Sequence, residues 1–450
     1  MSRSQYPEDF LFGVASAAYQ IEGAVAEDGR VPSQWDLFPP RDRETLHRGF
    51  PDHYHRYRDD VALLARLGVS SYRFSLAWPR LFTEDRKPNP KGLAFYHRLL
   101  DALDAAHIVP LVTLYHWDLP QWLVEKGGWA HRDTARYFTD FAELALTTYG
   151  DRVPLWITLH DPQAEAFLGY GRGIQAPGRQ NWVEALQAAH HLLLAHGWAV
   201  QGFRGLNLKS RMGIALTLTP ILSASPREED RLAAERADAL YNRWFLDPLI
   251  RGQYPADLLE LFQPLMRHRP WIQEGDFAAL ATPLDFLGVN FFGQATARHH
   301  QLAVDLPGLD VSLTPINAGL GAAHDTEEVP SPTPLYDLLR RLARDYPAIP
   351  LVVTANGLLT QEETPDPDGR IRDVDRQRFL AAHLEQVAQA LGENLPVQGY
   401  YAWAFLDGFE WAHGSRRQSG LVYVDATTRE RRLKESAVWY QAFLAGEADL

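Results

Sequence analysis

Eight short runs of Val, Ile, Leu and aromatic residues recur along the chain, and amphipathic stretches separate most of them. Each run has the length of one strand, and stretches such as 60–68, 96–106 and 141–150 have the pattern of a helix. A strand followed by a helix, eight times over, predicts a parallel (β/α)8 barrel, the TIM-barrel fold in the α/β class. The runs begin at Leu11, Val69, Val109, Val153, Met212, Asp285, Pro350 and Gln398.

The chain length suits one such barrel, because α/β barrels often extend over a long chain as one domain. With 450 residues, we expect a single domain over residues 1–450, with long βα loops over its C-terminal face. Two connections, 302–334 and 365–369, are rich in Pro and Gly. We interpret both as loops over the site.

The charge balance and the residue types exclude several classes of partner. The chain has 44 basic and 57 acidic residues, a net charge of −13, which argues against nucleic acid. The absence of cysteine excludes disulfides, thiolate nucleophiles and Cys-type zinc sites. No third ligand accompanies His53 and His55, so we expect no metal and no cofactor. The densest basic stretch contains Arg429, Arg431, Arg432 and Lys434. We interpret it as a solvated face.

The chain shows no targeting or membrane segment. Its first residues, MSRSQYPEDF, lack the apolar core of a signal peptide. No apolar run approaches the length that spans a bilayer. We therefore expect a cytoplasmic protein without a membrane partner, and its oligomeric state stays open.

Hydrogen-bonding side chains and indoles follow most of the eight runs. In a (β/α)8 barrel the C-terminal strand ends form the site, and this mixture suits a sugar, which is rich in hydroxyls and has apolar faces. The stretch VVTANGL at 352–358 is the exception, because Ala355 places only a methyl group at its strand end. The other ends lead to Gln20, Arg73, His116, Trp117, His160, Asp161, Asn290, Phe292, Trp403, Glu410 and Trp411.

Several longer motifs, in this order along the chain, resemble glycoside hydrolase family 1, the β-glucosidase family. They are FLFGVASAAYQIEGA, YRFSLAWPRLF, YHWDLPQWL, FLGYGRGIQAPGR, GVNFF and FLDGFEWAHGSRRQSGLVYVD. The resemblance implies a small-molecule β-glycoside as substrate and retaining hydrolysis by two glutamates. One glutamate protonates the leaving oxygen while the other attacks the anomeric carbon.

The chain departs from the family pattern at both glutamates. Thr-Leu-His-Asp-Pro stands where Thr-x-Asn-Glu-Pro is usual, so Asp161 replaces the acid/base and is one methylene shorter. His160 replaces an asparagine that binds the sugar 2-hydroxyl in the family. Thr-Ala-Asn-Gly stands where Thr-Glu-Asn-Gly is usual, and Ala355 cannot form a glycosyl ester. Phe292 replaces a tyrosine that hydrogen-bonds the nucleophile.

The sugar-binding positions of the family are kept. The resemblance assigns Gln20, His116, Glu410 and Trp411 to the innermost subsite and Trp403 to the face of the sugar ring. Glu410, where the phospho-sugar branch has serine, favours a neutral 4,6-diol. By their places at strand ends, Trp117, Asn290 and Phe292 are further candidates for substrate contacts.

Arg73 holds the nucleophile's carboxylate in the family, and here that partner is missing. A buried guanidinium without a counter-charge is costly. We therefore expect a small anion or water beside Arg73.

Three functions remain open. The first is an enzyme that acts on β-glycosides without an enzyme-bound ester, with Asp161, His160 and Arg73 as catalytic candidates. The second is a sugar-binding protein that has lost catalysis, and the third is an engineered, nucleophile-deficient β-glucosidase. Asp161 could instead cap the helix after Pro162, and His160 could simply fill the space of the asparagine. Phe292 favours natural divergence, because a knockout would change the nucleophile alone.

The methyl group of Ala355 leads to a direct prediction. With an activated aryl β-glucoside we expect no burst and no covalent glycosyl-enzyme. Hydrolysis by double displacement should be several orders of magnitude slower than with a carboxylate nucleophile. Rapid-quench kinetics with mass spectrometry of the quenched protein measures both, and a glycosyl adduct on the chain would contradict the interpretation.

Overall fold

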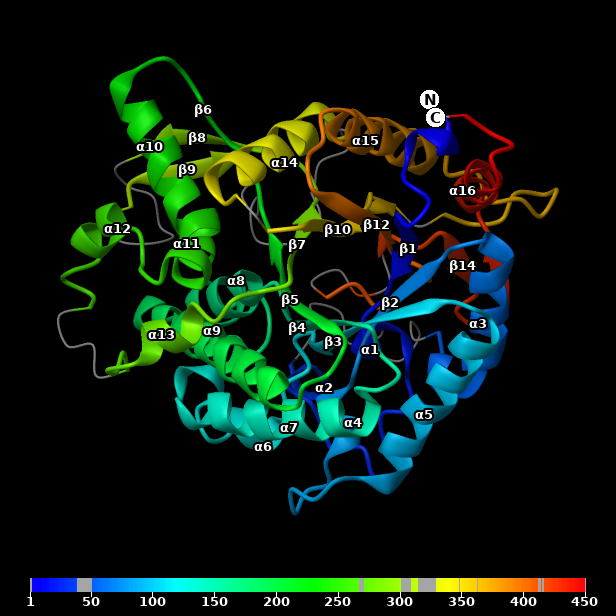
Figure 1. Cartoon of the computed structure of the whole chain (residues 1–450), viewed down its shortest axis with the longest axis horizontal. Coiled ribbons are helices and arrows are strands. Elements are labelled where there is room, and N and C mark those ends of the chain that lie inside the picture. Colours follow the sequence, from blue (N-terminus) through cyan, green and yellow to red (C-terminus); the bar gives the residue numbers. More distant parts are fainter. Residues whose placement is uncertain are drawn as a thin grey trace.

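The structure is a computed structural model, which describes residues 2–38, 51–266, 271–300, 309–314, 329–347, 349–361, 363–411, 414 and 417–449. Parallel strands close into an eight-stranded barrel in the order β1-β12-β10-β7-β5-β4-β3-β2, and helices surround it (Figure 1). Every predicted run forms one of these strands, so the predicted (β/α)8 barrel is confirmed. The strands are β1 (Leu11–Ala15), β2 (Ser71–Ser75), β3 (Val109–Tyr115), β4 (Leu155–His160), β5 (Arg211–Thr217), β7 (Phe286–Phe291), β10 (Leu351–Asn356) and β12 (Val397–Trp403).

The outer layer consists of helices, and their ends follow ordinary capping chemistry. Asn89 accepts a hydrogen bond from the amide of Lys91 and precedes Pro90 at the start of α5, and Asn181 caps α9 in the same way. No helix among the described residues combines the length and apolar character of a membrane span. The helices are α1 (Ala18–Ile21), α2 (Gln34–Leu37), α3 (His53–Leu67), α4 (Trp78–Leu81), α5 (Pro90–Ala105), α6 (Gln121–Val124), α7 (Asp133–Tyr149), α8 (Pro162–Ala164), α9 (Trp182–Gly205), α10 (Glu228–Asp238), α11 (Trp244–Arg251), α12 (Ala256–Leu261), α13 (Asp276–Leu280), α14 (Thr333–Asp345), α15 (Val374–Gly392) and α16 (Glu435–Ala445).

Small sheets lie outside the barrel, and one of them corrects a prediction. The predicted loop at 302–334 contains a strand, β9 (Val311–Thr314). This strand pairs antiparallel with β8 (Ala295–His299), and β8 also pairs with β6 (Ile221–Ser223). The buried and exposed residues of β9 alternate, as in a half-buried strand. Residues 302–308 and 315–328 lie outside the described part of the chain. The other small sheets are β11 (Thr360–Gln361) with β13 (Arg417–Gln418), and β14 (Val422–Val424) with β15 (Arg431–Leu433).

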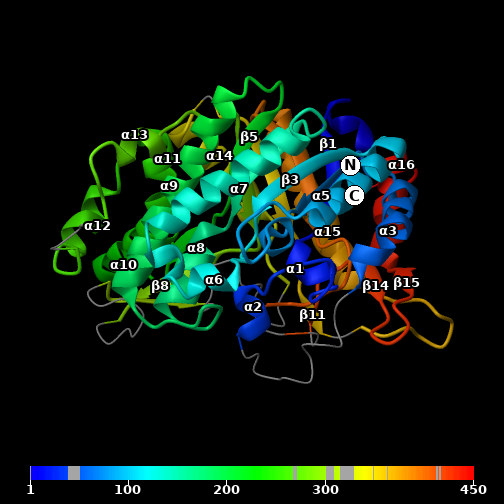
Figure 2. The same ribbon diagram turned by 90° about the horizontal axis from the view of Figure 1, so that it is seen from below.

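The chain ends meet on one side of the barrel. The short 3-10 helix Arg3–Gln5 packs near α16, which also lies against α3 and α15 (Figures 1 and 2). The segment that leads into α16 thereby reaches the barrel mouth from outside.

The end of β10 is irregular at the position that lacks a carboxylate. Its register shifts between Val353 and Ala355 against β7, and between Val353 and Asn356 against β12. Irregularities of this kind re-aim side chains and free backbone groups near active sites. Beneath it, a cluster of strand side chains fills the barrel: Ala15, Leu111, Leu155, Ile157, Ala215, Phe286, Val352 and Tyr401.

Gly357 fixes the distance between the ends of β10 and β12. A Cβ atom on Gly357 would lie 1.8 Å from the carbonyl oxygen of Trp403, a backbone atom that cannot swing away. We expect Gly357→Ala to lower the free energy of unfolding by about 1–3 kcal/mol or more. The control is Gly392→Ala at the end of α15, where a Cβ meets nothing within 4 Å, so its stability should hold or rise slightly. Urea unfolding measures both, and equal midpoints would contradict this packing.

Candidate active site

Arg73, on β2, is buried inside the barrel with 1% of its surface exposed. Its guanidinium donates to Thr113 Oγ1 at 3.2 Å and Asn290 Oδ1 at 3.3 Å. It also donates to the Thr354 carbonyl at 2.8 Å and His160 Nδ1 at 2.7 Å. A guanidinium has five N–H donors, so one Nη2 hydrogen has no acceptor among the described residues. Arg73 thus joins the ends of β3, β4, β7 and β10.

The charge of Arg73 survives its burial. Burial lowers its pKa to about 10, and the nearby carboxylate of Asp161 opposes that shift. The guanidinium therefore stays protonated at neutral pH. The four acceptors that hold it are neutral groups.

His160 is held in one tautomer. A guanidinium can only donate, so His160 Nδ1 accepts from Arg73, and Asn290 Nδ2 approaches the same nitrogen at 3.2 Å. The proton of the neutral ring therefore lies on Nε2, which is 3.4 Å from Asp161 Oδ2. Burial, with the neighbouring His116 and Arg73, lowers the pKa of His160 well below its usual range. The ring is thus a neutral group whose Nε2 lies near Asp161 without a hydrogen bond to it.

Asp161 occupies the N-cap position of α8, but its side chain makes no capping hydrogen bond, so the capping alternative is wrong for the carboxyl. The carboxyl turns inward, where Asn290 Nδ2 donates to Oδ1 at 2.7 Å and the Thr217 hydroxyl donates to Oδ2. Burial raises the pKa of Asp161 to about 6, against the opposing hydrogen bonds from Thr217 and Asn290. A carboxyl with this pKa keeps its proton in mildly acidic solution, as a general acid requires.

Ala355 and Phe292 leave the neighbouring strand ends without reactive atoms. Ala355 is fully buried and pairs in register with Asn290 of β7. Phe292 follows β7 directly and is partly buried. Their hydrocarbon side chains can neither attack a sugar nor hydrogen-bond a nucleophile.

Stacked rings cover the adjoining side of the mouth. His116 lies on His160 with ring centroids 3.6 Å apart, and it stacks at 5.7 Å on both Trp403 and Trp411. His116 Nε2 is buried without a hydrogen-bond partner among the described residues, which argues against a satisfied structural histidine. Trp117 instead uses its indole N–H, which donates to the His160 carbonyl at 3.0 Å. Trp117 therefore braces the backbone of the strand end.

Glu410 lies beside Gln20 as the resemblance predicts. Gln20 Nε2 donates to the Phe409 carbonyl at 2.7 Å and lies 3.5 Å from Glu410 Oε2. The Ser419 hydroxyl donates to the other carboxyl oxygen of Glu410. Burial raises the pKa of Glu410 to about 7, while the bond from Ser419 opposes the shift. Glu410 is only 8% exposed, so its carboxyl has one fixed place.

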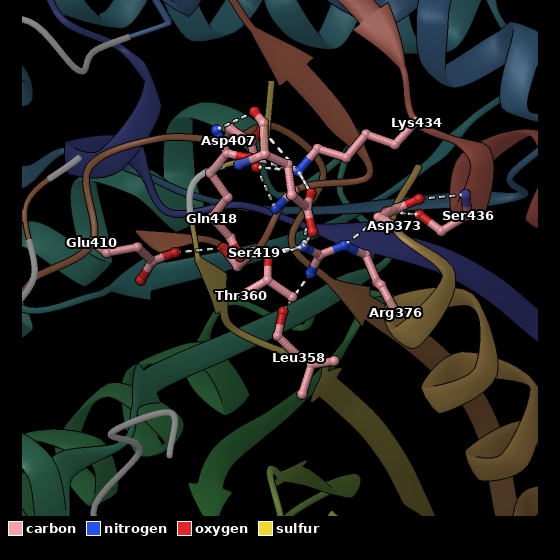
Figure 3. A network of polar contacts seen from close by, with 12 residues as sticks. Leu358, Thr360, Asp373, Arg376, Asp407, Glu410, Gln418, Ser419, Lys434 and Ser436 are labelled. Atoms are coloured by element: carbon pink, nitrogen blue, oxygen red, sulfur yellow. Dashed lines mark hydrogen bonds and ion pairs between the residues drawn. The ribbon is translucent and has the colours of Figure 1, made fainter. Parts of the chain in front are cut away.

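A buried ammonium group holds the loop that carries Glu410 and Ser419 (Figure 3). Lys434, whose side chain is 0% exposed, contacts Asp407 at 2.9 Å and Glu363 at 2.8 Å. It also donates to Gln418 Oε1 at 3.2 Å, one residue before Ser419. Three acceptors match the three donors of an ammonium group. The segment before α16 thereby fixes the loop from behind.

Arg376 of α15 supports the same loop (Figure 3). It donates to Asp373 at 3.0 Å, to Thr360 Oγ1 at 2.8 Å and to the Gln418 carbonyl at 3.3 Å. Since β11 and β13 pair at these residues, Arg376 secures the junction of two loops.

The solvated-face interpretation of the basic stretch is therefore wrong for two of its members. Lys434 is buried as described, and the side chain of Arg431 is 6% exposed and pairs with Asp60 at 2.7 Å. Arg432, with 40% of its side chain exposed, pairs with Glu430 and matches the interpretation better.

Sequence reasoning missed Thr217 and Ser419. Thr217 is the last residue of β5, so the rule that strand ends carry site residues points to it as well. Ser419 follows Glu410 by nine residues in a loop, and no sequence pattern marks their contact.

The comparison with known families agrees with this geometry. A family model described as glycosyl hydrolase family 1 matches residues 2–448. The chain belongs to glycosyl hydrolase family 1. The resemblance stated from the motifs is thus confirmed, and the chain is glycosidase-like over essentially its whole length.

Individual family 1 relatives match over nearly their full length. Beta-glucosidase A of Acetivibrio thermocellus is 40% identical over 448 residues, which are 98% of each chain. The structure of the β-glucosidase from Exiguobacterium antarcticum B7 has a TM-score of 0.91 and 38% identity, with 99% of each chain covered. The family 1 β-glucosidase of Thermotoga maritima in complex with isofagomine lactam has a TM-score of 0.87 and 34% identity, with 98% of this chain and 99% of that chain covered.

The pKa of Glu410 leads to a pH-dependent prediction. An ionised carboxylate accepts hydrogen bonds from sugar hydroxyls on both oxygens, whereas a protonated one offers fewer acceptors. Since burial raises the pKa to about 7, affinity for methyl β-glucoside should increase as pH rises through that value. Glu410→Gln should bind more weakly and without this dependence, and Ser419→Ala should move the midpoint to higher pH. Calorimetric titration over a buffer series measures all three. An unchanged pH dependence in Glu410→Gln would place the titrating group elsewhere.

Proposed function

We propose that this protein acts on β-glycosides by a route that forms no glycosyl ester with the enzyme. The carrying observation is the contrast between the two sides of the mouth. On one side Glu410 is anchored beside Gln20, as a sugar clamp requires. On the other side the strand end that carries the family nucleophile presents the buried methyl group of Ala355.

Sugar recognition rests on the residues kept from the family. Glu410 and Gln20 accept hydrogen bonds from hydroxyls and donate to them. His116 is a further candidate contact, because its Nε2 has no hydrogen-bond partner among the described residues. The half-buried indoles of Trp403 and Trp411 supply apolar faces. The relatives' names as β-glucosidases support a β-configured ring as ligand.

The nucleophile that the chain lacks comes from outside it. The remaining N–H of Arg73 suits a small oxyanion or an anionic group on the substrate, because such groups prefer a guanidinium partner. That anion attacks the anomeric carbon itself or orients a water that does. In the water route, the water oxygen bonds the anomeric carbon and its proton passes to the anion. The bond to the aglycone oxygen breaks, and Asp161 gives that oxygen its proton.

His160 acts in this scheme as a positioning residue. Its Nδ1 is committed to Arg73, and a second proton there would oppose the guanidinium. The ring therefore does not take up a proton during the reaction. It offers an acceptor to Arg73 on one edge and lies close to Asp161 on the other.

The contact between His160 and Arg73 also favours natural divergence over engineering. Removal of a glutamate at position 355 alone would leave Arg73 with only Thr113, Asn290 and the Thr354 carbonyl as acceptors. Here the imidazole supplies another at 2.7 Å, from a different strand. The two replacements therefore act together.

A sugar-binding protein without catalysis is the second candidate. Asp161 is fully buried, and Thr217 and Asn290 hold both of its oxygens, which restricts its access to a leaving group. A test must therefore separate turnover from binding.

The test is a rate series against anion concentration, with formate, azide and phosphate and an activated aryl β-glycoside. The assay is run at a pH below the pKa of Asp161, which is about 6, so that this carboxyl keeps its proton. We expect turnover to rise about tenfold or more with the anion. Arg73→Met should abolish that rise while it weakens sugar binding much less.

Sugar binding by calorimetry serves as the folding control for every variant. A flat response to anions in the parent protein, with sugar binding intact, would overturn the catalytic proposal in favour of binding alone. Ala355→Glu is the matched variant, because it places a carboxylate at the position of the family nucleophile. If it restores retaining hydrolysis, Phe292 and His160 are secondary adjustments to a site that lacks one carboxylate.

A further inference from the structure

A separate recess of about 290 Å³ opens on the flank of the barrel, away from the residues described above. It lies between α4 with the turn that follows it, α6 and α7, which neighbour one another in the outer layer (Figure 1). None of the residues assigned to the mouth lines it.

Aromatic rings form most of its walls. Trp122 of α6 and Tyr137 of α7 meet edge to face, with centroids 5.2 Å apart and planes at 82°. Trp78 and Phe82 complete the apolar lining. Trp78 is itself fixed by stacking on Phe141 at 5.0 Å, so this surface is preformed.

The indole of Trp122 presents its ring to the recess, and its N–H is turned away. Nε1 of Trp122 is buried and makes no hydrogen bond with any described residue, and an atom closed to water is closed to a ligand hydroxyl as well. The polar contacts for a ligand must therefore come from other side chains of the recess.

Arg86 is held over the same rings by an unusual backbone. Its φ of 61° is in the left-handed region, which non-glycine residues seldom adopt and which is enriched at ligand clamps. The guanidinium carbon lies 5.9 Å from the centroids of both Trp122 and Tyr137. It donates to the Tyr137 hydroxyl at 3.3 Å, and it has no carboxylate partner among the described residues.

Two carboxylates stand on the rim. Asp85 lines the recess and pairs with Lys87 at 2.6 Å. Asp140 makes neither a hydrogen bond nor an ion pair with any described residue, and burial, with Glu143, raises its pKa. The recess therefore offers unused donors and an unused acceptor beside aromatic faces.

We propose that this recess binds a neutral saccharide unit as an accessory site. Hydroxyl groups both donate and accept, so a sugar can satisfy Arg86 and Asp140 together. The recess combines cations, Arg86 and the Lys126 ammonium 5.8 Å from the Trp122 ring centroid, with the carboxylates of Asp85 and Asp140, so a ligand of either charge sign meets repulsion as well as attraction. A purely apolar ligand would leave Arg86 and Asp140 desolvated. The C–H face of a sugar ring matches the walls.

The volume limits the size of the ligand. Pockets for drug-sized molecules begin at about 300 Å³, and this recess lies at that lower end. It therefore takes one terminal sugar ring of a glycoside or glycan, and the rest of the molecule extends into solvent.

The experiment uses methyl β-glucoside and calorimetry, with ligand-observed NMR for weak binding. In Glu410→Ala, which disables the sugar clamp of the mouth, we expect one weak site to persist. Adding Trp122→Ala should weaken that site about tenfold or more. Adding Trp439→Ala, which removes another partly buried indole on α16, should leave it unchanged. Asp140→Asn is an exposed variant that keeps the fold and should also weaken it.

The outcomes separate this proposal from the proposed function. Binding in Glu410→Ala that ignores both Trp122→Ala and Asp140→Asn would overturn the accessory site. So would the absence of any binding in Glu410→Ala. If the parent protein itself shows only the Trp122-dependent site, and Glu410→Ala changes nothing, the proposed function is contradicted and this inference stands.

Discussion

The buried guanidinium of Arg73 is the constraint on which the rest of the mouth depends. Burying a lone charge costs several kcal/mol unless hydrogen bonds replace its hydration. Strands β3, β4, β7 and β10 must therefore each end in an acceptor, and their ends supply Thr113, His160, Asn290 and the Thr354 carbonyl. The last of these is free to accept because the register of β10 shifts at that residue.

The same constraint determines the chemistry of the neighbouring groups. Because Arg73 occupies Nδ1 of His160, the ring is neutral and its Nε2 lies 3.4 Å from Asp161 Oδ2. Asp161 is then surrounded by donors, yet its burial raises the pKa to about 6. Loss of one carboxylate from the mouth thus leaves the other as a weak acid next to neutral partners. A carboxyl in this state can give a proton, and under the proposed function the nucleophile comes from outside the chain.

The side of the mouth that carries Glu410 is stabilised by different interactions. Lys434 and Arg376 are buried cations that tie together a loop after β12, the β10–α15 connection and the segment before α16 (Figure 3). Each is paired with carboxylates and further hydrogen bonds, which is the condition under which buried charges are tolerated. Both cations donate hydrogen bonds to Gln418, and the neighbouring Ser419 donates to Glu410. These contacts hold the Glu410 carboxyl in place although it lies on a loop.

The sequence by itself determined the barrel, the places of its strands and the family. The alternation of apolar runs and amphipathic stretches has few other solutions, and strand ends must converge at one mouth. Motifs could therefore single out Gln20, Arg73, His116 and Glu410 as candidates, and Ala355 at the position of the family nucleophile. Only the tertiary structure decided which groups surround Arg73. His160 and Arg73 are 87 residues apart, and Lys434 is 71 residues from Glu363. The local charge pattern predicts that Lys434 is a solvated surface residue. It fails because the partners that bury Lys434 come from distant loops. Hydrogen bonds and ion pairs of this kind depend on three-dimensional distance and burial, which no local periodicity encodes.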